Sequence, residues 1–126
     1  MEVSPDRAAL EEFFADVPLG REVYDAVAAV VEGCGPATTR VTRSQVALRR
    51  RTGFCWVWLP GRYLRRPAAQ VVVSVALDHP DPSPRWKQVV EVGRGRRWMH
   101  HLEVRSVDEV DDEVARWVAA AYELAG

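Results

Sequence analysis

The sequence predicts an α+β domain in which an antiparallel sheet of five or six strands packs one face against helices from both ends of the chain. Three observations predict it. Apolar residues recur at helical spacing near both ends of the chain, and they alternate with a period of two in between. The connections between the central runs are mostly too short for crossover helices, which favours antiparallel pairing. A chain of 126 residues has the length of one domain, so we expect a single domain over residues 1–126.

Two helices are expected in the first 36 residues. Residues 4–6 (Ser-Pro-Asp) are typical of a helix start, because Ser can accept a hydrogen bond from a free N–H and Pro suits the first helical position. Pro18 is expected to end this helix, whose apolar stripe is Leu10, Phe13, Phe14 and Val17. A second helix is expected from about residue 20 to residue 32, because two glycines and Pro36 follow it.

Six strands and a last helix are expected after these two helices. The strands are rich in Val and aromatic residues and are separated by Gly and Pro; their expected ranges are 38–42, 46–51, 54–59, 70–77, 87–92 and 97–104. Ser106 and Glu109 have the spacing of a capping box, which predicts a helix start there. The apolar stripe of that helix is Val110, Val114, Trp117, Val118 and Ala121.

Charge is sorted along the chain. Residues 1–36 hold eight acidic against two basic side chains, residues 37–105 hold fourteen Lys and Arg against four acids, and residues 106–126 hold six acids against one Arg. The expected helices are therefore acidic and the expected sheet is basic, which favours an anionic partner for the sheet. Sixteen of the seventeen basic residues are Arg, a skew typical of a GC-rich genome, so the position of each Arg is more informative than the choice of Arg.

Several classes of protein are disfavoured. No apolar stretch approaches the roughly 18 residues of a membrane span, and the first residues lack a signal pattern, so we expect a cytoplasmic protein with no membrane contact. Cys34 and Cys55 form no CxxC motif and are expected to be reduced thiols. No catalytic, cofactor or metal-ligand motif occurs, so we expect no cofactor, no metal and no catalytic residue.

The most specific local signal is residues 52–53 (Thr-Gly), which predict a two-residue hairpin turn between two strands. In that register Arg49 faces Trp56 and Ala47 faces Trp58. One face would then be buried against the helices, and it carries Val46, Leu48, Cys55, Val57 and Leu59. The other face would carry Ala47, Arg49, Arg51, Phe54, Trp56 and Trp58. If 70–77 is a central strand, this second face adds only Val72, Ser74 and Ala76, whose small size predicts a shallow groove.

We expect this second face to present cations and rings to an anionic partner: a nucleic acid, a phosphorylated small molecule or an acidic protein. Single-stranded nucleic acid is bound by such a combination of charge and stacking. The same pairs of Arg and aromatic rings are also explained by cation–π contacts that only stabilise the surface. The candidate ligand-binding residues are Arg43, Arg49, Trp56, Trp58, Arg85, Lys87 and His101. Four further arginines would extend the same side: Arg40, Arg62, Arg65 and Arg66.

The adjacent histidines give an alternative. His100 and His101 point to opposite faces of their strand, so they cannot readily chelate one metal together. We expect His100 to be a hydrogen-bonded core histidine and His101 to be a possible ligand contact. A small enzyme with either histidine beside Arg85 and Lys87 in one pocket is a competing hypothesis. A third is self-association, in which the basic sheet meets the acidic helices of a second copy.

The ordered set of motifs resembles a known family. It comprises residues 41–51 (Val-Thr-Arg-Ser-Gln-Val-Ala-Leu-Arg-Arg-Arg), 54–59, 85–87 (Arg-Trp-Lys), the two histidines, Trp117 and Tyr122. From about Phe13 onward the chain resembles an uncharacterised bacterial domain family of unknown function, members of which occur alone or as C-terminal domains of predicted transport proteins. The resemblance implies an α+β fold and an accessory or binding role, and it supplies no catalytic residues. We therefore expect a non-enzymatic binding module.

Overall fold

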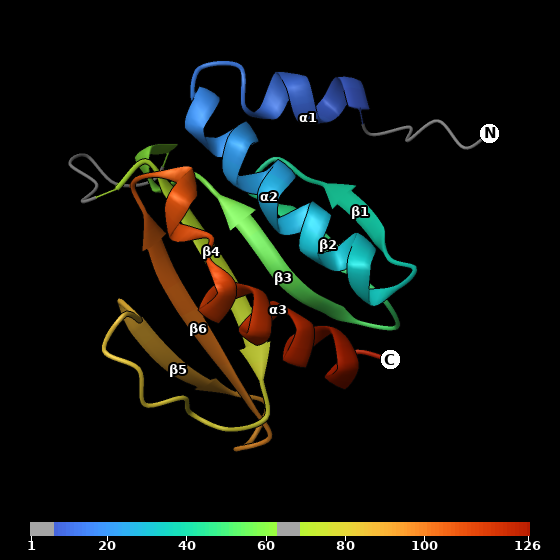
Figure 1. Ribbon diagram of the computed structural model, residues 1–126, viewed down its shortest axis with the longest axis vertical. Helices are drawn as coiled ribbons and strands as arrows, with labels where there is room; N and C mark the ends of the chain where they lie inside the picture. The colour runs from blue at the N-terminus through green and yellow to red at the C-terminus, as the bar shows by residue number, and fades with distance from the viewer. Residues whose placement is uncertain (1–6, 63–68) are drawn as a thin grey trace.

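Three helices pack on one face of a six-stranded sheet (Figure 1), which confirms the predicted α+β fold. The computed structural model describes residues 7–62 and 69–126. The helices are α1 (Arg7–Phe13), α2 (Pro18–Cys34) and α3 (Asp112–Leu124), and the short 3₁₀ helices are η1 (Pro60–Arg62) and η2 (Val107–Glu109). The strands are β1 (Thr38–Val41), β2 (Val46–Arg49), β3 (Gly53–Trp58), β4 (Val71–Leu77), β5 (Gln88–Val92) and β6 (Arg97–Val104).

The sheet is antiparallel throughout, with the strand order β1-β2-β3-β4-β6-β5. After β4 the chain leaves one strand position free and forms the edge strand β5 beyond it. It then returns as β6, which fills the position between β4 and β5. β4 is therefore central, and all seven of its residues are buried. Figure 1 shows β1 and β5 at the two edges, with α2 and α3 lying across the middle strands.

The core lies between the helices and the face of the sheet that they cover, here called the helix face. Alternate residues of β2 and β3 point into it, as the sequence predicts: Val46, Leu48, Cys55 and Val57 are each no more than 3% exposed. The helices supply apolar stripes at a spacing of three and four residues, which is what an amphipathic helix needs to bury one side. The buried stripes are Val23, Val27 and Val31 on α2, and Val114, Trp117, Val118 and Ala121 on α3.

Three helix boundaries differ from the prediction: the end of α1, the start of α2 and the start of α3. Pro18 begins α2 and does not end α1, which already ends at Phe13. The backbone N–H groups in the first turn of a helix have no acceptor within the helix. Pro, which has no N–H, therefore loses no hydrogen bond at the first position of α2. The predicted start at residues 4–6 lies outside the described residues. The last helix begins at Asp112, because Asp111 caps it by accepting a hydrogen bond from the Val114 N–H at 3.1 Å. Ser106 caps η2 instead.

The β2–β3 hairpin has a different register from the predicted one. Leu48 pairs with Cys55 and Ala47 with Trp56, and the pairing then shifts so that Arg49 faces Gly53. The turn predicted at residues 52–53 is wrong, because Gly53 already belongs to β3 and residues 50–52 connect the two strands. Since the turn comes earlier in the chain, the predicted partners are off by two residues, and the ladder is irregular at its end. A displacement of two preserves the face of each side chain, whereas a displacement of one would have reversed it.

Phe54 is a correction to the predicted faces. The hairpin prediction placed it beside the arginines, but it is 1% exposed and belongs to the core. Its ring meets the ring of Tyr122 on α3 edge to face, with centroids 5.6 Å apart. The irregularity at the start of β3 removes strict alternation there, so Phe54 and the following Cys55 are both buried.

Candidate ligand-binding groove

The face of the sheet opposite the helices, here called the distal face, carries a single row of side chains across all six strands. Cross-strand partners share a face, so the row can be followed from pair to pair. It runs Arg40, Ala47, Trp56, Ser74, His101, Gln88. Trp58 and Met99 lie on the same face, two residues along their strands from Trp56 and His101.

A groove of about 450 Å³ opens on this face. Its lining residues are Ser44, Gln45, Trp56, Trp58, Ser74, Met99 and His101. The groove exists because central strand β4 contributes only small side chains to the distal face, between the indoles of β3 and the long side chains of β6. Pairing of Trp56 with Ser74, and of Ser74 with His101, places large walls on both sides of a small floor. The shallow groove that the sequence predicts from the small side chains of this strand is present in the structure.

The floor of the groove is a hydrogen-bonded chain. Trp58 Nε1 donates to Ser74 Oγ at 2.9 Å, and Ser74 Oγ lies 2.6 Å from His101 Nδ1. The imidazole also meets the Trp58 ring edge to face, with centroids 6.2 Å apart. Burial, and secondarily the proximity of His100, lower the pKa of His101 below its usual 6.5, so the ring is neutral at physiological pH.

Arginines flank the groove on the β1–β2 side. Arg40 precedes Trp56 by two positions in the cross-strand row. Arg49 lies beside the Trp56 ring: a Cβ built on Gly53 would be 3.4 Å from Arg49 Nη1 and 2.8 Å from Trp56 Cζ2. Arg97 also reaches Gly53, and its Nη2 donates to the Gly53 carbonyl at 2.6 Å. The distal face therefore has uncharged groove walls, with the Arg40 guanidinium on its β1 edge and the Arg49 and Arg97 guanidinium groups near the start of β3.

Arg43 occupies the turn between β1 and β2, immediately before the lining residue Ser44. Its side chain is exposed, and its carbonyl oxygen accepts a hydrogen bond from Arg62 Nη1 at 3.4 Å. Arg62 itself lies over the Phe13 ring, with 4.2 Å from its Cζ to the ring centroid. The Arg62 side chain therefore contacts α1 and does not extend the groove. Arg65 and Arg66 lie outside the described residues.

Arg85 and Lys87 are not part of the groove. Arg85 Nη1 contacts Asp111 at 3.0 Å and Glu113 at 2.9 Å, and its Nη2 donates to the Glu109 carbonyl. The hydrogen bond to Glu113 is the main reason that the pKa of Arg85 is raised. Its charge is therefore compensated at the start of α3. Lys87 is exposed, and its backbone N–H donates to the His101 carbonyl at 2.8 Å.

His100 is a core residue, as the sequence predicts. It is 0% exposed, and its Nδ1 donates to the Trp98 carbonyl at 3.0 Å while its Nε2 accepts from the Asp81 N–H at 2.9 Å. The indole of Trp86 lies against it, with centroids 4.9 Å apart. The enzyme hypothesis required a histidine, Arg85 and Lys87 in one pocket. The structure does not bring them together.

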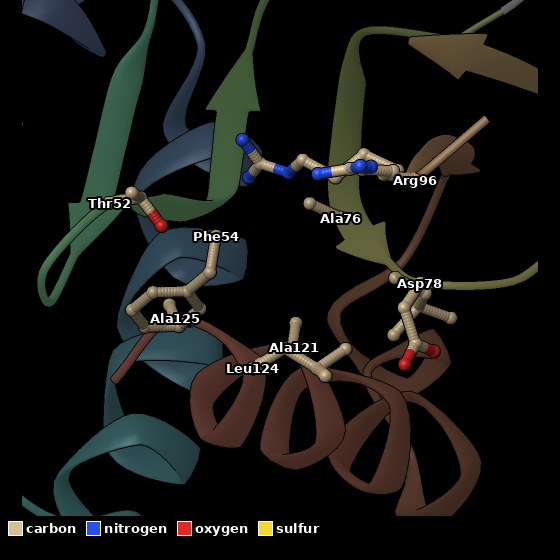
Figure 2. Close-up of a pocket in the computed structure, with 10 residues that line it drawn as sticks. Thr52, Phe54, Ala76, Asp78, Arg96, Ala121, Leu124 and Ala125 are labelled. Atoms are coloured by element: carbon tan, nitrogen blue, oxygen red, sulfur yellow. The ribbon is translucent and has the colours of Figure 1, made fainter. Parts of the chain in front are cut away.

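A smaller cavity of about 210 Å³ lies where β3 begins and β4 ends, above the last turns of α3 (Figure 2). Its apolar floor includes Phe54, Ala121 and Leu124, and Arg96 and Asp78 lie on its rim. The candidate ligand-binding residues named from the sequence lie elsewhere, and the groove is more than twice as large.

Sequence reasoning missed several residues of the groove. Met99 has the same strand alternation as His101, and that signal could have found it. Gln45 and Ser44 follow Thr42, whose Oγ1 accepts from both of their backbone N–H groups at 3.3 and 3.4 Å. This Thr-centred turn is readable from the sequence, but its position at the mouth of the groove depends on the pairing of the sheet.

No helix in residues 7–62 and 69–126 is long and apolar enough to cross a membrane, and no cluster of three metal-ligating side chains occurs there. Searches of curated proteins and of solved structures found no match. Residues 10–125 match the family described as a domain of unknown function (DUF5655). The resemblance to an uncharacterised domain family is thereby confirmed, and the chain belongs to DUF5655.

Proposed function

We propose that this domain is a non-enzymatic binding module whose distal face takes a planar anionic ligand: a nucleotide, either free or as a unit of a single-stranded nucleic acid. The observation that carries the proposal is the groove itself, with two indoles, a hydrogen-bonding floor and guanidinium groups beside it. A volume of about 450 Å³ lies within the usual range for small-molecule sites, roughly 300–1,000 Å³.

The distribution of charge decides how such a ligand would lie. The seven lining residues are uncharged when His101 is neutral, so the groove suits a ring and not a phosphate. Stacking of a base on an aromatic side chain is worth about 1–3 kcal/mol and is available from Trp56 and Trp58. Arg49 lies next to Trp56, and Arg40 lies in the same cross-strand row beyond Ala47, so both are on the side of the groove where they would contact the phosphate. The distal face therefore offers aromatic rings to the base of a nucleotide and positive charge to its phosphate.

The floor supports binding more than nucleophilic catalysis. Ser74 is 3% exposed, and its Oγ already accepts from the Trp58 indole. A hydroxyl that is buried and occupied in this way is poorly placed to attack a substrate. Among the described residues no Arg or Lys lines the groove to stabilise a developing anion.

Titration of tryptophan fluorescence with nucleoside monophosphates and with short single-stranded RNA and DNA tests the proposal. We expect binding that weakens steeply as salt increases, because phosphate contacts dominate that dependence. Arg49→Ala should weaken binding and reduce the salt slope, and Trp56→Ala should weaken binding at every salt concentration. If only the oligonucleotides bind, the ligand is a strand; if the monophosphates bind as well, a free nucleotide suffices.

The matched control is Arg116→Ala, which removes an exposed Arg from α3, on the other side of the molecule from the groove. It should bind like the unmodified protein. Absence of binding by every nucleotide and strand, or binding that neither salt nor Arg49→Ala alters, would exclude the proposed function.

A further inference from the structure

We infer that the groove selects rings that present a carbonyl oxygen at the edge away from the sugar, as uracil and guanine do, over rings that present an amino group there, as cytosine and adenine do. This inference rests on the proposed function and specifies its ligand. It follows from the position of one proton on His101, which the hydrogen-bonded floor determines.

The directions of the two hydrogen bonds at Ser74 Oγ determine where His101 carries its proton. The Trp58 indole has a donor and no acceptor, so Ser74 Oγ must accept from it at 2.9 Å. Ser74 is almost fully buried, and the remaining polar atom beside its Oγ is His101 Nδ1 at 2.6 Å. The hydroxyl therefore donates its proton to Nδ1. An Nδ1 that accepts carries no proton, so the neutral imidazole of His101 has its proton on Nε2.

The proton on His101 Nε2 is accessible from the groove. Among the described residues, no buried polar side-chain atom lacks a hydrogen-bond partner. Within the described part of the chain, His101 makes a hydrogen bond through Nδ1 and none through Nε2, so Nε2 is accessible, and His101 lines the groove. The accessible Nε2–H is a fixed donor: it cannot become an acceptor without breaking the Ser74 bond. Trp56, which also lines the groove, carries an indole N–H that can only donate.

The fixed Nε2–H donor of His101 decides which edge of a base matches the groove. If the phosphate lies at Arg40 and Arg49, the edge of the base away from the sugar enters the groove. A carbonyl oxygen at that edge accepts from the fixed donor, whereas an amino group would face it as a second donor. A site that leaves a donor unpaired loses about 1–3 kcal/mol, so discrimination of roughly 5- to 150-fold is expected.

The experiment compares uridine with cytidine monophosphate, and guanosine with adenosine monophosphate, by calorimetry at one salt concentration and neutral pH. We expect the carbonyl-bearing member of each pair to bind at least about fivefold more tightly. His101→Phe keeps a ring in the same place and removes the donor. It should lower the affinity for uridine monophosphate to that for cytidine monophosphate, and leave the latter nearly unchanged.

Ser74→Ala is the second variant, because it removes the group that fixes the proton and leaves the imidazole in place. It should reduce the discrimination within each pair without abolishing binding. His79→Phe is the control: His79 lies on the exposed loop between β4 and β5, bonded to Asp78, and its loss should change nothing. Circular dichroism of each variant verifies that it is folded.

The outcomes separate the two claims. Equal binding within both pairs, preference for the amino-bearing rings, or discrimination that survives both His101→Phe and Ser74→Ala would overturn this inference while the proposed function stands. Absence of binding by any nucleotide would remove the proposed function, and the inference with it.

Discussion

The small side chains on the distal side of β4 make the groove possible. Val72, Ser74 and Ala76 are each no more than 5% exposed, although no helix among the described residues covers this face. Their burial comes from larger neighbours on β3 and β6 that rise around them. Ser74 also does what an Ala there could not, since its hydroxyl links the Trp58 indole to the His101 imidazole.

The two cysteines are expected to differ in reactivity. Cys55 is 0% exposed, and burial raises the pKa of its thiol to about 12, so it stays protonated and inaccessible. Cys34, at the end of α2, is partly exposed. A thiol reagent at neutral pH should therefore modify one cysteine rapidly in the folded protein and the second only upon unfolding.

The variant Cys34→Ser gives the control for this prediction. It should show almost no labelling until denaturant is added, and one thiol afterwards. Rapid labelling of folded Cys34→Ser would mean that Cys55 is far more accessible than its packing indicates.

At the scale of elements, the junction between α2 and β1 is held by α3. Gly35 ends α2 with φ at +148°, a conformation that residues with a side chain rarely adopt. The Tyr122 hydroxyl lies against it and donates to the Pro36 carbonyl at 2.9 Å. A side chain at position 35 would meet both an unfavourable backbone angle and this hydroxyl.

Substitution of two neighbouring glycines tests that junction. Gly35→Ala should lower the free energy of unfolding by about 1–3 kcal/mol, because of backbone strain and the clash with Tyr122. Gly33→Ala is the matched control, since nothing lies within 4 Å of a Cβ there and the position is helical. It should be neutral or stabilising by up to about 1 kcal/mol. Equal effects of the two variants in urea denaturation would contradict this account of the junction.

The β4–β5 connection is attached to the helix layer by a second set of contacts. Asp81 accepts from Trp86 Nε1 at 2.9 Å and from the Ser83 N–H at 3.1 Å. Trp86 then packs on Trp117 of α3, with ring centroids 4.1 Å apart. Arg85, which the sequence analysis named as a candidate ligand-binding residue, and its neighbour Trp86 instead fix this connection with their side chains. The Trp86 indole is buried against Trp117, where it contributes more to the stability of the fold than it would on the surface.

At the scale of the whole molecule, the stability of the fold should depend on the two neutral histidines. Burial is the main cause that lowers the pKa of His100 and of His101 below 6.5; the Asp81 carboxylate opposes this at His100, and His79 adds to it. Between the lowered folded values and 6.5 the unfolded chain binds more protons than the folded one. The free energy of unfolding should therefore be fully retained above about pH 6.5 and should fall as the pH decreases below it.

Urea denaturation between about pH 7.5 and pH 5 measures this dependence. The carboxyl groups of Asp81 and Asp111 have pKa values lowered below 3.8, so their contribution is lost only at more acidic pH. His100→Gln should be less stable at pH 7.5 and show a flatter profile. If it does not fold, His101→Gln should still flatten the profile in part, and His79→Gln should alter it least, because His79 is the smallest of the causes that act on the pKa of His100. A stability that is constant or increases toward pH 5 would exclude the histidines as its source.

The sequence by itself determined the order and type of the elements, because a helical stripe and a two-residue alternation are local consequences of which side chains must be buried. It also determined which side chains of β2 and β3 face the helices, except for Phe54, where an irregular ladder breaks the alternation. Its local signals at Pro18 and Ser106 were misplaced: Pro18, predicted to end the first helix, begins α2, and Ser106, predicted to start the last helix, caps η2, since each residue type suits more than one place in a turn.

Only the tertiary structure decided which candidate residues meet. Trp56, Trp58 and His101 line one groove because β6 inserts beside β4, a choice of neighbour that no local pattern encodes. The same pairing placed Arg40 in the row of Trp56, while Arg85 was taken by the carboxylates of α3. The sequence sets the charge and size of each side chain, but the partner that pairs with it or covers it is set by long-range strand pairing and helix packing.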